Sequence, residues 1–189
     1  CDFVSGPFMV EENDMKKKHW RFKPDFMGKE AILGEIGTHA YNLANFVTSE
    51  KPLRVSANLR VLTSGRKTYD DGQLVFEYSN SRLGRMWLSF VAAGNEHGLS
   101  FKIHGTEGSL EWSQEQPESL YLRSPSNAEQ RITPGFPERM SVDGFHACRL
   151  REGHPEGYVL AFANLYRDFA DKFISKKIGV ENTLGHFPD

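Results

Sequence analysis

The feature that most constrains the fold is a change of hydrophobic period near residue 50. From about Leu33 to Thr48, apolar residues recur at helical spacing, so this segment is predicted to be a helix with one buried face. From Leu53 to Val61, apolar and polar residues alternate, which is typical of a strand with one wet face. The chain therefore combines helical and extended segments in one short sequence.

Further strands are predicted after this point, separated by turn sequences of a few residues. They cover Gln73 to Tyr78, Gly84 to Ala92, Leu99 to His104, Ser109 to Trp112 and Leu120 to Arg123. Strands joined this closely must mostly pair antiparallel, because a parallel crossover needs a dozen or more residues. A second helix is expected after Gly153-His154-Pro155, with an end near Lys176-Lys177.

This order of elements favours an α+β fold, with an open, predominantly antiparallel sheet and both helices packed on one face. In the strand with Met86, Trp87, Leu88 and Phe90, apolar residues point to both sides of the sheet. The face away from the helices is therefore expected to be an oligomer interface, with a locally amphiphilic surface as the alternative. The length of 189 residues is interpreted as a single domain, 1–189.

Charge and composition exclude several classes of partner. The formal net charge of −2 gives no positive field for nucleic acid, and no apolar run approaches the roughly 20 residues that span a bilayer. Cys1 and Cys148 have neither CxxC spacing nor the density of a disulfide scaffold, which favours a reducing compartment and a cytoplasmic protein. Because the chain begins without Met, it is interpreted as a fragment.

The main candidate for chemistry is the start of the first helix. Glu35 and His39 are four residues apart and should share a helix face, and Asn42 continues that edge. A carboxylate can orient an imidazole and tune it as a proton donor and acceptor near neutral pH. A half-exposed structural ion pair would have the same spacing.

Other polar residues suit a polyhydroxyl ligand, although each also has a structural explanation. A helix cap at His154, a solvated turn at Asn95 and His97, and stacking of Arg21 on Trp20 remain alternatives. A metal site drawn from Glu35, His39, His97 and His154 has no support from ligand spacing, so no metal is predicted.

Three segments, taken together, resemble the Gfo/Idh/MocA oxidoreductases. The run from His19 to Asn45 resembles the family region in which a WR pair and a glycine-containing loop lead into a DxGxH helix, and GTEGSLEW and GHPEGYVLAFANLYRDFA look like bacterial members. The resemblance covers nearly the whole chain from Trp20 onward. It implies a C-terminal α+β domain that binds substrate and forms homodimers or homotetramers through its sheet.

The family's NAD or NADP is bound by an N-terminal Rossmann domain, which the resemblance implies is missing here. In agreement, the sequence contains no GxGxxG, GxxxxGK[ST], HExxH or GxSxG pattern. His39 occupies the His position of DxGxH and Glu35 the Asp position, while the Lys of the family's EKP motif has no counterpart. These two residues are the predicted catalytic pair.

The predicted function is therefore that of part of an NAD(P)-dependent oxidoreductase for a sugar, inositol or related polyol, active only at full length. The alternatives are a metal-dependent sugar isomerase or lyase and a non-catalytic binding or assembly domain. The residues predicted to bind substrate are Arg21, Thr38, Asn42, Asn95, His97, His154, Glu156 and Tyr158.

Overall fold

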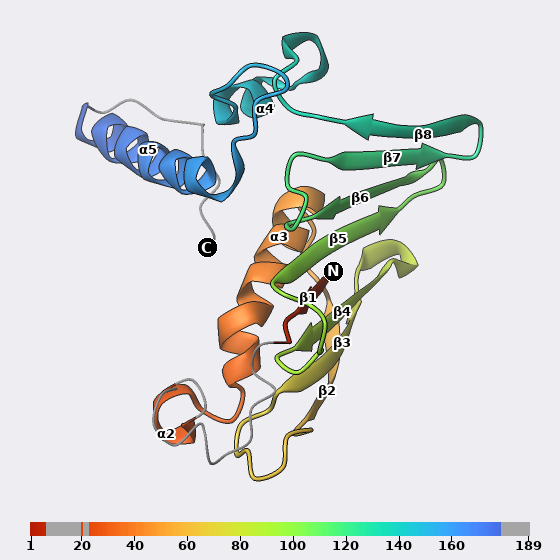
Figure 1. The fold of residues 1–189 in the computed structure, drawn as a ribbon, viewed down its shortest axis with the longest axis vertical. Coiled ribbons are helices and arrows are strands. Elements are labelled where there is room, and N and C mark those ends of the chain that lie inside the picture. Colours follow the sequence, from red (N-terminus) through yellow and green to blue (C-terminus); the bar gives the residue numbers. More distant parts are fainter. Residues whose placement is uncertain (7–19, 21–22, 179–189) are drawn as a thin grey trace. The chain divides into compact units, whose positions relative to one another are not determined.

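The structure is a computed structural model that describes residues 1–6, 20 and 23–178 (Figure 1). The strands are β1 (Asp2–Val4), β2 (Arg54–Arg60), β3 (Asp71–Glu77), β4 (Leu83–Ser89), β5 (Gly98–His104), β6 (Ser109–Ser113), β7 (Leu120–Ser124) and β8 (Asn127–Ile132). The α-helices are α2 (Pro24–Met27), α3 (Thr38–Thr48), α4 (Val142–Ala147) and α5 (Gly157–Ile178). A π-helical segment, η2 (Leu33–Gly37), precedes α3, and η3 (Ser79–Ser81) and η4 (Pro137–Arg139) are 3₁₀ turns.

The strands form an open mixed sheet in the order β2-β3-β4-β1-β5-β6-β7-β8. β1 is parallel to β4 and antiparallel to β5, and β2, β3 and β4 pair antiparallel in sequence order. β6, β7 and β8 are likewise antiparallel neighbours. The predicted α+β fold with a mostly antiparallel sheet is confirmed, and β1 and β8 are added to the predicted strands.

Residue contacts divide the chain into two compact units. The first unit contains residues 1–103 and 113–115, and the second contains 104–112 and 116–189. The interpretation of 1–189 as one domain stays a prediction.

In the first unit, η2 and α3 cover one face of the sheet (Figure 1). Leu88 is fully buried, and its Cδ1 lies 3.0 Å from where a Cβ on Gly37 would stand. The rings of Tyr41 and Phe76 pack with centroids 6.1 Å apart. Burying a large apolar side chain contributes roughly 1.5–3 kcal/mol, so this layer stabilises the unit.

The four apolar residues of this strand lie on two sides of the sheet, as predicted, and the oligomer interface stays a prediction. Met86, Leu88 and Phe90 are 3%, 0% and 2% exposed, so they belong to the core of the unit. Alternation along β4 turns Trp87 the other way, where it is 38% exposed and its indole N–H donates to Asp71 Oδ2 at 2.9 Å. Of the four residues, Trp87 is thus the one available to an interface.

The second unit contains the β6-β7-β8 meander, α4 and α5. Residues 124–151 contain β8, η4 and α4, and Ser141 caps α4 by accepting a hydrogen bond from the Gly144 N–H. The predicted second helix is confirmed as α5, which ends at Ile178. No helix among residues 23–178 is both long enough and apolar enough to cross a membrane.

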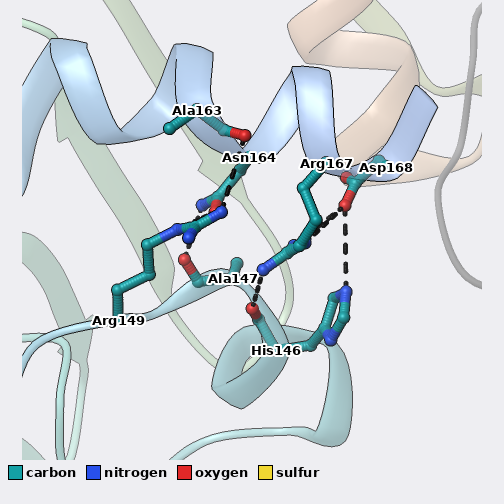
Figure 2. Close-up of polar contacts among 7 residues, drawn as sticks. All are labelled: His146, Ala147, Arg149, Ala163, Asn164, Arg167 and Asp168. Carbon is teal, nitrogen blue, oxygen red and sulfur yellow. Dashed lines mark hydrogen bonds and ion pairs between the residues drawn. The ribbon is translucent and has the colours of Figure 1, made fainter. Parts of the chain in front are cut away.

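The large apolar side chains of α5 are exposed rather than buried. Asn164 and Arg167 face α4, because Asn164 donates to the Ala147 carbonyl at 2.5 Å and Arg167 Nη1 to the His146 carbonyl at 2.8 Å (Figure 2). The exposed apolar residues of the helix are Tyr158, Val159, Phe162, Leu165, Tyr166, Phe169, Phe173 and Ile174.

Candidate functional site

The predicted catalytic pair lies where a π-helical turn meets α3. The Thr38 N–H donates to the Leu33 carbonyl, five residues back, and the Thr38 hydroxyl donates to the Gly34 carbonyl at 3.0 Å. The Thr38 side chain thus satisfies a carbonyl whose usual backbone partner is used elsewhere. π-turns inside α-helices are frequent at functional sites.

The π-turn alters the geometry expected for Glu35 and His39. Side chains four residues apart share a face in an α-helix, which has 3.6 residues per turn. A π-turn has more residues per turn, so this spacing does not place Glu35 and His39 in the α-helical arrangement. Glu35 is half-buried within the turn, and His39 is exposed one residue into α3. Asn42 is exposed on the next turn of the same helix.

A buried aromatic ring brings His39 and His97 into one region of the first unit. Phe3, 2% exposed, contacts the His97 ring edge-on with centroids 4.7 Å apart and planes at 70°. The His39 ring lies 6.2 Å from the same Phe3 centroid, at 61°. Two imidazoles that are 58 positions apart in the sequence therefore meet the same side chain.

Asn95 and His97 lie in the turn between β4 and β5. The Asn95 amide donates to the Ala92 carbonyl at 3.1 Å, and the Asn95 carbonyl accepts from the Gly6 N–H at 2.9 Å. Asn95 therefore shapes the turn through its backbone and side chain, and the side chains of both Asn95 and His97 are exposed.

In the second unit, two carboxylates fix the loop that carries His154. One oxygen of Glu156 accepts from the Arg149 and Leu150 N–H groups at 2.6 and 2.5 Å. One oxygen of Glu118 accepts from the Glu156 and Gly157 N–H groups at 3.0 and 2.8 Å, at the start of α5. A carboxylate at this position also complements the helix dipole.

These contacts give Glu156 a structural role, and they identify Glu118 as a residue that the sequence did not reveal. Glu118 is 38 positions from Glu156, so no local pattern links the two residues. His154 is exposed, and Tyr158 is 70% exposed and packs on Phe162 with ring centroids 4.9 Å apart. Burial, followed by the charges of Glu156 and Glu118, raises the pKa of the Cys148 thiol, which suits an unreactive cysteine.

One group of metal-ligand atoms occurs among the described residues. His146, Asp168 and Asp171 have donor atoms within 4.8 Å of one another, and all three are half-buried. Arg167 already donates two hydrogen bonds to Asp168 Oδ1, at 3.1 and 2.8 Å, and His146 Nε2 lies 3.8 Å from that oxygen (Figure 2). A guanidinium on the same carboxylate opposes a cation there, so the cluster is better explained as packing between α4 and α5.

The predicted metal alternative gains nothing from the geometry of the first unit. Glu35, His39 and His97 all lie in described positions, and they do not form a donor group within the same 4.8 Å limit. Arg21 lies outside the described residues, whereas its neighbour Trp20 is 49% exposed.

Comparison with known proteins supplies the wider context. A family model described as the GFO/IDH/MocA C-terminal domain matches residues 4–111, more than half of the chain. The uncharacterized oxidoreductase YfiI of Bacillus subtilis is 28% identical over 174 residues, which cover 90% of this chain and 44% of that protein. Levoglucosan dehydrogenase of Pseudarthrobacter phenanthrenivorans is 25% identical over 160 residues, 73% of this chain and 38% of the relative.

Among solved structures, an inositol dehydrogenase homologue from Azotobacter vinelandii, complexed with NAD+, superposes with a TM-score of 0.85 at 27% identity. The match covers 94% of this chain and 46% of that one. The chain thus spans about half the length of the relatives that it matches. The family model matches more than half of the chain, and the chain belongs to the Gfo/Idh/MocA family.

Proposed function

We propose that this chain is the substrate-binding and oligomerising part of an NAD(P)-dependent oxidoreductase acting on a sugar, inositol or related polyol. The observation that carries the proposal is the convergence of His39 and His97 on Phe3, in a chain of this family. The names of the relatives support the substrate class, since one was solved with NADH and myo-inositol and another is a levoglucosan dehydrogenase.

The nucleotide is proposed to bind mainly outside this chain. Its sequence has no glycine-rich fingerprint of the kind that cradles a pyrophosphate at a helix N-terminus. NAD or NADP is therefore assigned to a domain outside this sequence, and only the proton transfer is derived from the residues described here.

Oxidation of a secondary alcohol removes a hydride from carbon and a proton from oxygen. When bound, the nicotinamide supplies the hydride chemistry. His39, exposed on a rigid helix, accepts the hydroxyl proton during oxidation and returns it during reduction. Glu35, in the turn before it, orients the ring or binds a neighbouring hydroxyl, in place of the shorter Asp of the family pattern.

The remaining predicted substrate ligands stay proposals, and those of each unit are considered separately. Arg21, Thr38, Asn42, Asn95 and His97 are proposed to bind the hydroxyl groups of the polyol. His154, Glu156 and Tyr158 are also proposed to serve substrate binding, with Glu156 acting mainly through the backbone of its loop.

The full-length protein provides the test. We expect NAD(P)H to form when it is mixed with NAD(P) and a panel that includes myo-inositol and levoglucosan. His39→Ala should lower kcat by about 10²–10⁴-fold with little change in nucleotide affinity, because general acid/base assistance typically contributes that much. Glu35→Gln should lose less, and Glu35→Asp should retain activity.

Near-wild-type kcat in His39→Ala would contradict the assignment of the proton carrier. Stoichiometric zinc or manganese in the purified protein would instead favour an isomerase or lyase. A homodimer or homotetramer in the cytoplasm is also proposed, through the sheet face that carries Trp87, and Trp87→Asp should weaken assembly in analytical ultracentrifugation.

A further inference from the structure

The backbone of His97 is fixed by hydrogen bonds on both sides of the residue. The His97 N–H donates to Glu115 Oε1 at 3.3 Å, and the His97 carbonyl accepts from the Leu99 N–H at 3.0 Å. The preceding carbonyl, that of Glu96, accepts from the Ser5 hydroxyl at 2.9 Å. The turn is therefore held against both the segment that follows β1 and the segment that follows β6.

Gln114 contacts the imidazole directly. Its side-chain nitrogen Nε2 lies 2.9 Å from His97 Nδ1, and its backbone N–H donates to the carbonyl of the buried Leu99 at 2.8 Å. With the amide nitrogen of Gln114 turned toward the ring, Gln114 donates and Nδ1 accepts, so in this arrangement Nδ1 carries no proton. The proton of the neutral ring then sits on Nε2, which makes no hydrogen bond within the described part of the chain.

Phe3 fixes the plane of the same ring. The centroids of the two rings are 4.7 Å apart in an edge-on arrangement, and Phe3 is buried at 2% exposure. With Nδ1 bound to Gln114 and one ring edge against Phe3, the orientation of His97 is set by two neighbours. His97 is exposed, so its Nε2–H is available as a hydrogen-bond donor to a ligand.

We infer that Gln114 is a positioning residue that holds His97 as its Nε2–H tautomer, so that His97 donates a hydrogen bond to a ligand oxygen. The inference rests on the proposed function, since the oxygen would be that of a polyol hydroxyl or its carbonyl product. The two imidazoles then have different roles. His39 exchanges a proton with the substrate, whereas His97 donates a hydrogen bond and keeps its proton.

Nitrogen-15 NMR of the full-length protein tests the tautomer, at a pH where the imidazoles are neutral. In the wild type, His97 Nδ1 should have the shift of an unprotonated ring nitrogen and Nε2 that of a protonated one. Gln114→Glu replaces the donor by a carboxylate, which only accepts, so the proton should move to Nδ1. Gln114→Met fills a similar volume without a hydrogen bond and should give a mixture of tautomers.

Gln116→Glu is the matched control, because it adds the same charge two residues away on an exposed side chain. It should leave the His97 shifts unchanged. A protonated Nδ1 in the wild type, or shifts that do not respond to Gln114→Glu, would overturn the inference. The wild-type spectrum alone decides the matter if a variant fails to fold.

Kinetics separate this inference from the proposed function. Gln114→Met should raise KM for the polyol about 2- to 10-fold with a smaller effect on kcat, because a single neutral hydrogen bond is weakened. An unchanged KM would contradict the positioning role of Gln114, even if NMR finds the expected tautomer of His97. No nicotinamide-dependent turnover by the wild type would sink the proposed function while leaving the tautomer measurement valid.

Discussion

Asp70 is a fully buried carboxylate that holds the connection between β2 and β3. Its two oxygens accept from the Leu62 and Thr63 N–H groups at 2.7 and 3.0 Å, and Arg66 Nη1 lies 3.0 Å from Oδ2. Burial lowers the pKa of the Arg66 guanidinium, while the charge of Asp70 opposes that shift. Each buried charge of the pair therefore depends on the opposite charge of its partner.

Breaking this pair should be costly. Asp70→Asn leaves the Arg66 guanidinium buried without its counter-charge, and we expect a loss of about 3–5 kcal/mol in urea unfolding. Glu77→Gln is the control, because its ion pair with Arg54 is exposed at 3.7 Å and should contribute less than about 1 kcal/mol. Equal losses in the two variants would contradict the role of Asp70.

At this scale the sequence reveals which residue types suit the chemistry but not how they are held. His39, His97 and Glu156 were identifiable as polar residues in glycine-rich or helix-start contexts. Gln114, Glu118 and Phe3 were not, because each acts on a partner that is 17, 38 or 94 positions away. Contacts at such separations leave no local pattern.

Among the elements, the π-turn before α3 offers a sharp test of packing. A methyl group added to Gly34 would enter open space, whereas a Cβ on Gly37 would meet Leu88 Cδ1 at 3.0 Å. We expect Gly34→Ala to stabilise the protein by about 0.5–1 kcal/mol through reduced chain entropy. Gly37→Ala should destabilise it by about 1–3 kcal/mol through overpacking against a buried side chain.

Thermal unfolding of the two variants measures this difference directly. Their midpoints should move in opposite directions from the wild type, although the same single methyl group is added. A rise in both midpoints would show that the helix has room to move away from β4.

Glu118 offers a second test, at the start of α5. Glu118→Ala removes the acceptor for two N–H groups, and we expect a loss of about 0.5–2 kcal/mol with faster amide exchange at Glu156 and Gly157. Glu118→Gln should lose less, since an amide oxygen can still accept. Glu107→Ala, at an exposed turn of the same unit, should change neither exchange rate.

Long periodic elements were predictable, and short or polar ones were not. α3 and α5 follow from their apolar periods, and the antiparallel pairing follows from short connections. β1 has three residues, too few to display a period of two, and β8 is exposed along nearly its whole length. The π-turn has no sequence signal beyond its two glycines, which permit several backbone conformations.

For the whole molecule, the decisive question is what this chain does alone. It lacks a recognised pyrophosphate-binding loop, and it spans about half of its relatives. We therefore expect no NAD(P) binding by the isolated chain in titration calorimetry and no turnover of any polyol. Micromolar binding by the isolated chain would contradict the assignment of the nucleotide to a further domain, and the full-length protein is the positive control.

The place of β1 in the sheet has a consequence for the order in which the chain folds. Asp2 pairs with Trp87 on one side and Ser100 on the other, so β1 needs partners that are synthesised much later than itself. The β2-β3-β4 meander can form from neighbouring segments, but closing the loop back to β1 costs chain entropy and slows folding. On the ribosome, β1 must therefore wait, with Phe3 uncovered, until β4 and β5 have emerged and the strand can join them.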